Sequence, residues 1–257
     1  MRGQINERYE YQQEIIDHLV EENGYVQRNH KCFDKKYALD RELLFEFLKD
    51  TQPDTLDRLK KVFGDDLEET IINTINRFVV SKKGSLLSVL KHGIDISNEH
   101  LNLLYGKPAT SFNPELSKLY DENIFSVMEE VNPDEEDKER VDLVIFVNGF
   151  AIISFELKSN SQGQNYENAI LQYRTKRDPK NRLFRFKAGC LVNFAMDTEE
   201  VYMTTQLDKE KTFFLPFNMG KGEGVDSGAG NPIFGDKYSV SYMWEDILKK
   251  RYFNRTN

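Results

Sequence analysis

The first hundred residues repeat apolar side chains three and four positions apart, the spacing that gathers them on one face of a helix. In the first such stretch the stripe consists of Tyr11, Ile15, Ile16 and Leu19, and Gly24 suits the position just past a helix end. The same pattern recurs in four more stretches. We predict helices over residues 9–23, 39–49, 55–63, 67–80 and 86–92.

The pattern changes to short apolar runs after about residue 100. Between two of these runs stands Asn148-Gly149, a strong signal for a two-residue hairpin turn. A helical pattern returns over residues 165–176 and is followed by further strands. The predicted strands cover residues 103–105, 124–131, 142–147, 150–157, 189–194 and 201–205. These elements predict an α/β (α+β) fold, a central mixed β-sheet flanked by helices, with a helical N-terminal part.

Six glycines crowd residues 220–235, where apolar periodicity is weak, and a helical pattern resumes over 242–250. A loop of this length is typical of a functional segment or a linker. We therefore expect a domain over residues 1–212, mostly helical in 1–100 and with the sheet and crossover helix in 101–212. Residues 213–257 are expected to form a Gly-rich linker and the start of a connection.

The composition and the first residues of the sequence indicate in which cellular compartment the protein is expected. No apolar run approaches the roughly 20 residues of a membrane span, and residues 1–22 are charged throughout, unlike a signal peptide. Cys32 and Cys190 are isolated and fit no zinc spacing, so we expect reduced thiols in a cytoplasmic protein without a membrane partner. The four histidines are scattered and predict no site.

Charge is unevenly distributed along the chain. The net charge of −8 argues against nucleic acid, yet residues 174–187 hold seven Lys or Arg against one Asp. Local fields decide where a polyanion binds. Arg174, Lys176 and Arg177 are therefore candidate contacts to a DNA backbone, and a solvated loop is the alternative.

Three charges on the predicted hairpin suggest chemistry. Asp142 lies near the start of one apolar strand, and Glu156 and Lys158 lie at the end of the next. Asp, Glu and Lys are rarely buried without partners. Two carboxylates suit Mg²⁺, with the backbone carbonyl of Leu157 as a third ligand, and Lys158 would stabilise developing charge. The alternative is ordinary solvated charges at strand ends. On the following helix, Gln172 and Lys176 lie one turn apart.

The order Asp142…Glu156-Leu157-Lys158 resembles the PD-(D/E)xK nuclease motif. The surrounding phrase, Arg-Val-Asp-Leu-Val-Ile-Phe-Val-Asn-Gly followed by Phe-Glu-Leu-Lys-Ser, resembles the N-terminal endonuclease domain of type I restriction enzyme R (motor) subunits. Two departures stand out. Val141 replaces the motif's proline, and the family's Gln-x-x-x-Tyr would place a tyrosine at 176, where Lys176 stands, while Tyr173 is adjacent to Gln172. No first-helix carboxylate is assigned between Glu10 and Glu14.

The resemblance implies a restriction-endonuclease-like fold and Mg²⁺-dependent cleavage of double-stranded DNA. Asp142, Glu156, Lys158 and Gln172 would be the catalytic residues, and Mg²⁺ the cofactor. The chain would work with methyltransferase and specificity subunits. ATP would bind only to a helicase-like motor, whose G-x-x-x-x-G-K-[ST] loop is absent from the 257 residues.

Two other functions stay open on sequence grounds. One is a stand-alone PD-(D/E)xK nuclease of repair or recombination, and the other is a non-catalytic interaction module with a nuclease-like core. A parent gene with a phosphate loop would exclude the first, and a metal-binding assay would test the second.

The hairpin itself poses a geometric problem. A regular two-residue turn pairs Val147 with Phe150 and so places Asp142 opposite Phe155, on the other face from Glu156. A shared cation needs both carboxylates on one face. We therefore predict an irregular hairpin, through a bulge or a twist at Asp142, with the two carboxylates within roughly 4–6 Å.

Overall fold

The computed structural model describes residues 2–108, 113–134, 139–160, 163–222 and 228–250, with side chains from residue 9 onward. The α-helices of this part of the chain are α1 (Arg2–Glu21), α2 (Arg41–Thr51), α3 (Pro53–Phe63), α4 (Leu67–Val79), α5 (Leu86–His92), α6 (Pro114–Asp121) and α7 (Tyr166–Lys176). Short 3-10 turns η1 (His30–Cys32) and η2 (Gly64–Asp66) and a π-helical turn η4 (Met243–Ile247) complete the helical elements.

Nine of the described strands form one mixed sheet. In chain order they are β1 (Val26–Arg28), β2 (Phe33–Asp34), β3 (Leu39–Asp40), β6 (Phe125–Val131), β7 (Val141–Val147), β8 (Phe150–Leu157), β9 (Val192–Met196), β10 (Val201–Thr204) and β11 (Leu215–Pro216). The spatial order is β1-β6-β7-β8-β9-β10-β11, with β3 also paired to β8, and β1·β6 and β8·β9 are the parallel pairs. A separate hairpin joins β4 (Ile94–Ile96) to β5 (Glu99–Leu101).

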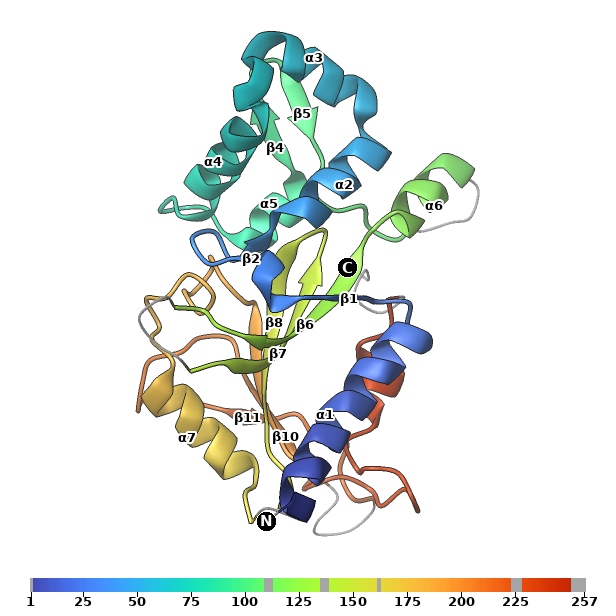
Figure 1. Ribbon diagram of the computed structural model, residues 1–257, viewed down its shortest axis with the longest axis vertical. Helices are drawn as coiled ribbons and strands as arrows, with labels where there is room; N and C mark the ends of the chain where they lie inside the picture. Colours follow the sequence, from blue (N-terminus) through green and yellow to red (C-terminus); the bar gives the residue numbers. More distant parts are fainter. Residues whose placement is uncertain (1, 109–112, 135–138, 161–162, 223–227, 251–257) are drawn as a thin grey trace.

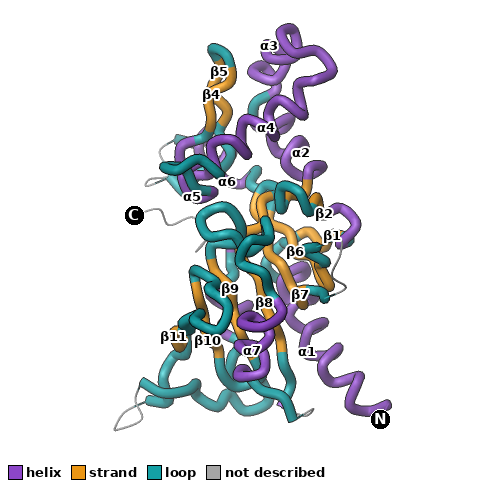
Figure 2. Tube along the Cα trace, turned by 90° about the vertical axis from the view of Figure 1, so that its left-hand side faces the viewer, coloured by secondary structure: helices purple, strands orange, loops and turns teal. Residues whose placement is uncertain are grey.

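The helices lie on both sides of this sheet and above it (Figures 1 and 2). On one face, Ala169 and Tyr173 of α7 pack with Val144, Phe146 and Ala195 of the strands. The apolar side chains on the other face of the sheet are part of a larger core, which also contains the apolar stripe of α1. Helices α2–α5 with β4 and β5 form a helical lobe whose buried side chains belong to the same core. The expected α/β fold, a mixed sheet flanked by helices with a helical N-terminal part, is confirmed.

Several boundaries differ from the sequence predictions, and each difference has a local cause. Asp40 caps α2 by accepting a hydrogen bond from the amide of Leu43, so that helix starts at Arg41 rather than 39. The strand predicted over 103–105 was wrong. Leu103 is buried, but its carbonyl accepts a hydrogen bond from the Asn148 side chain instead of a neighbouring strand. The strand predicted from 189 begins at Val192.

The segment after residue 212 packs against the rest of the protein where it is described. Val240, Tyr242, Met243, Trp244 and Leu248 all belong to the larger core. The helix predicted over 242–250 is instead the π-helical turn η4. The domain boundary at residue 212 stays a prediction. Residues 238–248 pack against the rest of the protein and therefore do not form a flexible tether.

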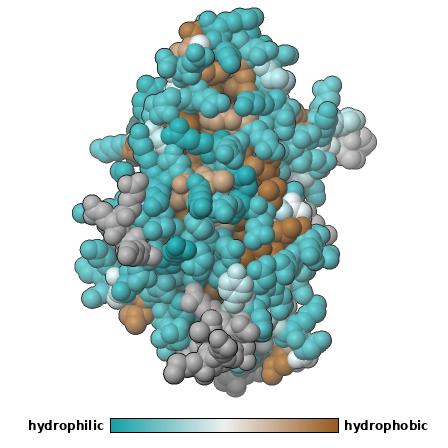
Figure 3. Space-filling model, in the orientation of Figure 1, coloured by the Kyte–Doolittle hydropathy of each residue, from teal (hydrophilic) through white to brown (hydrophobic). Residues whose placement is uncertain are grey.

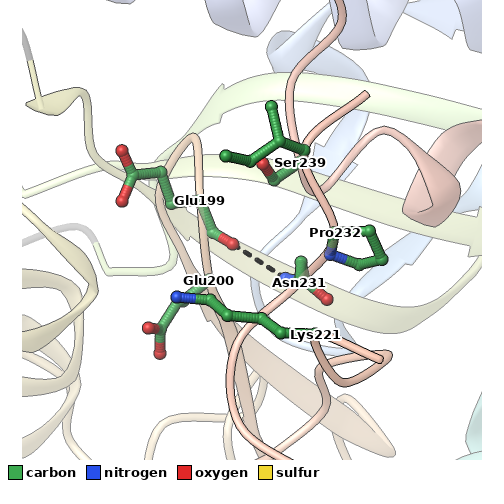
Figure 4. Close-up of a pocket in the computed structure, with 7 residues that line it drawn as sticks. Glu199, Glu200, Lys221, Asn231, Pro232 and Ser239 are labelled. Atoms are coloured by element: carbon green, nitrogen blue, oxygen red, sulfur yellow. Dashed lines mark hydrogen bonds between the residues drawn. The ribbon is translucent and has the colours of Figure 1, made fainter. Parts of the chain in front are cut away.

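Asn231 organises the Gly-rich stretch (Figure 4). Its side-chain amide donates to the carbonyl of Glu199 at 2.8 Å, and its side-chain oxygen accepts from the amide of Met219 at 2.7 Å. A hollow of about 550 Å³ beside it is lined by Glu199, Glu200, Lys221, Asn231, Pro232, Ile233 and Ser239. The bonds of Asn231 hold this loop against the turn before β10.

The surface in Figure 3 is mainly hydrophilic, with hydrophobic residues gathered near the middle of the view. Among the helices described here, none has the length and apolar character needed to cross a membrane.

Candidate active site

The hairpin of β7 and β8 is irregular, as predicted. Asn148 and Gly149 form a two-residue turn with φ of 47° and 82°, which Gly and Asn tolerate. Val147 pairs with Phe150, but the register shifts between Ile145 and Phe146, leaving one extra residue, Ile152, on β8. The bulge therefore lies inside the ladder and the turn keeps its two-residue form.

The bulge brings the acidic residues to one face. Beyond it, Leu143 pairs with Phe155, so the next position in register places Asp142 opposite Glu156. Because side chains alternate along a strand, Asp142 shares the face of Val144, the face that α7 covers. Ser154, two residues before Glu156, contacts Tyr173 of α7, so Glu156 points the same way. Their separation of 4–6 Å stays a prediction.

Asp142 is buried, with 2% of its surface exposed. Its Oδ2 accepts a 2.6 Å hydrogen bond from the amide of Leu157 and lies 3.9 Å from Nζ of Lys158. In a strand the N–H and C=O of one residue point to the same neighbour. The carbonyl of Leu157 is therefore directed toward the Asp142 side, where a third oxygen ligand was expected.

Glu156 is fully buried, and burial raises its pKa to about 8, with a further increase from the nearby charge of Asp142. Arg177 opposes this shift: its guanidinium donates to Oε1 at 2.7 Å. Oε2 has no hydrogen-bond partner in the described structure. An unpartnered buried carboxylate oxygen is costly, and a bound cation would satisfy it.

Lys158 is also buried, with 5% exposed. Its Nζ donates a 2.7 Å hydrogen bond to Oε1 of Gln172 on α7. The ammonium group is thus held between the strand carboxylate of Asp142 and the helix amide of Gln172. The structure brings together all four residues that were expected to be catalytic: Asp142, Glu156, Lys158 and Gln172.

The three cations expected to contact DNA do not share one environment. Arg174 donates to the carbonyl of Thr212 at 2.8 Å, and Lys176 is exposed and lies 3.5 Å from Glu139. Arg177 requires a correction. Its side chain is 1% exposed and bound to Glu156 and to the carbonyl of Arg140, so it does not offer its charge to the surface. No local sequence pattern indicates this burial, because the partner lies on another element.

The surroundings of Tyr173 indicate a structural role in the core. It is fully buried, and its hydroxyl lies 2.8 Å from Oγ of Ser154. Ser154 uses its single hydrogen to bond Oδ1 of Asn193, so Tyr173 is the donor to Ser154. In the first helix, Glu10 and Glu14 are exposed, while Gln12 is buried and donates to Glu129 of β6 at 3.3 Å.

The residues present fit a hard divalent cation. Two carboxylates and a backbone carbonyl are ligands that Mg²⁺ accepts, and Glu156 has a free oxygen. Within the described residues, no group of three or more His, Cys, Asp or Glu side chains gathers as a metal site. A cation at this site would therefore depend on two side chains, one main-chain oxygen and water.

Comparison with known families adds a decisive observation. The profile of the family described as type I restriction enzyme R protein N terminus matches residues 4–212. The chain belongs to this family. The match includes most of α1, the helical lobe, the bulged hairpin and α7, so it covers every residue of the candidate site. Among curated proteins, no match is found.

Proposed function

We propose that this chain is the nuclease domain of a type I restriction enzyme R subunit and cuts double-stranded DNA with the help of Mg²⁺. Membership of the restriction enzyme family supports the assignment to the R subunit of a type I restriction enzyme. The observation that carries the proposal is the buried pair of Asp142 and Glu156 on one face of the hairpin, with Lys158 beside them.

Asp142, Glu156 and the Leu157 carbonyl would hold the cation. Mg²⁺ at this position would polarise the scissile phosphate and activate a water molecule. The protein's own contribution is preorganisation: the Leu157 amide fixes Asp142, and Arg177 fixes one oxygen of Glu156. Lys158, held by Gln172, would place a positive charge where negative charge develops on the phosphate. Arg174 and Lys176 stay candidate backbone contacts.

The test uses the assembled restriction complex, with the full-length R subunit and its methyltransferase and specificity subunits. Asp142→Ala, Glu156→Ala and Lys158→Ala should each abolish DNA cleavage, since each removes a ligand or the stabilising charge. ATP hydrolysis should persist, because the proposed site lies outside a motor. Glu167→Ala, which removes an exposed carboxylate of α7, is the matched control. Cleavage at the wild-type rate by Lys158→Ala would contradict the proposal.

The same proposal places the complex in the cytoplasm and predicts that the isolated 257-residue chain cuts poorly without a motor to deliver DNA. Metal binding separates this function from a non-catalytic module. If Mg²⁺ bound to the wild type and to Asp142→Ala with equal affinity, the site would not be a metal site.

A further inference from the structure

Two segments far apart in the sequence contain cations but no acidic residue. Between Glu69 and Asp95 stand Arg77, Lys82, Lys83 and Lys91, and between Asp178 and Asp197 stand Lys180, Arg182, Arg185 and Lys187. The whole chain has 43 acidic against 35 basic residues. Acid-free segments with four cations each are therefore a strong local departure from its composition.

The fold joins these two segments. The amide of Leu86, at the start of α5, donates a 2.6 Å hydrogen bond to the carbonyl of Lys187. Arg182 lines a small cavity with Ile75 and Asn76 of α4. In Figure 1 the loop between α4 and α5 and the segment that follows α7 lie on the same side of the molecule. We name the joined surface, consisting of Arg77, Lys82, Lys83, Arg185 and Lys187, the basic face.

The cations of the basic face are exposed and lack protein counter-charges. All five residues are exposed, and no carboxylate of the described residues forms an ion pair with any of them. Arg182 lies beneath the face, where its Nε and Nη1 are buried without hydrogen-bond partners. Burial and the charge of neighbouring Arg185 lower the pKa of Arg182 to about 10. Among the described residues, the positive charges of this surface therefore have no ion-pair partner.

The backbone of both loops is held tightly. A Cβ at Gly84 would lie 1.7 Å from the carbonyl oxygen of Phe78, and one at Gly189 would lie 2.1 Å from that of Leu183. Phe78 and Phe186 are 43% and 48% exposed beside Arg77 and Lys187. The cations of the basic face therefore lie at the end of α4 and on two closely packed loops, with one exposed ring next to Arg77 and another next to Lys187.

We propose that the basic face binds the phosphate backbone of duplex DNA, and this inference rests on the proposed nuclease function. The segment from Arg177, which holds Glu156, to Lys187 connects the candidate active site directly to this face. Lys and Arg contacts to phosphates position a duplex without reading its sequence. The helical lobe would in this way hold DNA beside the site, while the cut is made at the sheet.

The experiment measures DNA binding by the 257-residue chain without divalent cations, using two unrelated labelled 20-bp duplexes and NaCl from 50 to 200 mM. The test variant combines Lys82→Gln, Lys83→Gln, Arg185→Gln and Lys187→Gln. The matched control combines Lys60→Gln, Lys61→Gln, Lys209→Gln and Lys211→Gln, four exposed lysines elsewhere. Both variants remove four positive charges.

We expect the test variant to lose affinity for both duplexes alike and its log–log salt slope to shrink by about 3 to 4, because each phosphate contact contributes about 0.9. The control should retain most of the wild-type slope. Equal slopes in the two variants, or no binding by the wild type at 50 mM NaCl, would overturn the inference. Circular dichroism confirms that each variant is folded.

A third variant separates this inference from the proposed function. Asp142→Ala should bind DNA as the wild type does and fail to cut in the assembled complex. If Asp142→Ala cut normally while the basic-face variant lost binding, only the nuclease proposal would fail. If Asp142→Ala failed to cut while the basic-face variant bound normally, only the basic face would be rejected.

Discussion

Arg177 holds one oxygen of the Glu156 carboxylate at 2.7 Å, and the other oxygen has no hydrogen-bond partner among the described residues. The guanidinium thereby offsets part of the cost of burying the carboxylate, and half of its binding capacity stays open. Burial alone would favour the neutral acid. The arrangement keeps a carboxylate inside the protein in a form that can exchange its proton for a cation.

Removing Arg177 should destabilise the protein. Arg177→Ala leaves the buried Glu156 carboxyl, which holds its proton at pH 7, without its hydrogen-bond partner, and we expect a loss of about 1–3 kcal/mol in the free energy of unfolding. Urea denaturation at pH 7 measures it. Arg174→Ala is the control, since among the described residues Arg174 bonds a single neutral carbonyl, that of Thr212, and its removal should cost about 1 kcal/mol. Equal losses would mean that the Arg177–Glu156 pair has no special weight.

The raised pKa of Glu156 makes stability depend on pH. The folded state holds this proton up to a pKa of about 8, and the unfolded chain releases it near the ordinary value of 4.5. The protonated Glu156 side chain therefore makes its full contribution to the free energy of unfolding below pH 4.5, and this contribution is lost as pH rises through 8. Glu156→Gln cannot ionise, so the stability it gains relative to wild type should grow from pH 5 to pH 8. Parallel urea midpoints across that range would show that Glu156 titrates normally.

Metal binding should displace the same proton. Because the cation requires the ionised carboxylate, Mg²⁺ affinity should rise between pH 6 and pH 8, by up to about tenfold per pH unit. Titration calorimetry in two buffers of different ionisation enthalpy counts the protons released at pH 7. Glu156→Gln should bind weakly and release none. A pH-independent affinity would place the bound ion away from Glu156.

Gln172 should act by positioning Lys158. Gln172→Leu removes the oxygen that accepts from Nζ, and we expect cleavage by the complex to fall about 10–100-fold. Gln172→Glu keeps an acceptor at this position and should retain more activity than Gln172→Leu. Full activity in Gln172→Leu would show that Lys158 needs no partner on α7.

The hairpin turn has its own requirement. Gly149 has φ of 82°, and a Cβ there would lie 2.3 Å from the carbonyl oxygen of Asp40, so Gly149→Ala should cost about 3 kcal/mol. At Gly64, with φ of 57° and ψ of −130°, a Cβ would meet nothing within 4 Å, and Gly64→Ala should cost only about 2 kcal/mol of backbone strain. Thermal unfolding of both variants compares the two costs. Equal shifts would indicate that the contact with Asp40 is relaxed at little cost.

Long periodic elements could be predicted because their signal is local. Residues 67–80 and 165–176 show helical spacing, and the structure has α4 and α7 there. The strands β1 to β5 were missed, since two or three residues hold too little pattern to detect. For β1 the pairing partner is also distant in the chain, since Val26 pairs with Ser126.

At the site, the sequence predicts that the hairpin needs a bulge, but it does not predict at which residue the bulge lies. The adjacent Ile152 and Ile153 both face the larger core, a pairing that strict alternation forbids and a bulge allows. Arg177 was misjudged for a different reason. Its neighbours in sequence are basic and polar, whereas its burial depends on Glu156 of β8 and on the carbonyl of Arg140, just before β7.

The packing of α1 against η4 has a consequence for how the protein is made. Tyr11 of α1 packs edge-on against Trp244 of η4, and just after the helix the side chain of Asn23 donates to the carbonyl of Trp244. The first helix emerges from the ribosome early. Its apolar stripe is fully covered only after the residues of η4, more than two hundred positions later in the chain, have been synthesised. Contacts of such long range slow folding and leave apolar surface exposed meanwhile. During synthesis α1 is therefore a natural binding site for chaperones, and ribosome stalling before residue 240 should produce a nascent chain that proteases cleave readily within α1.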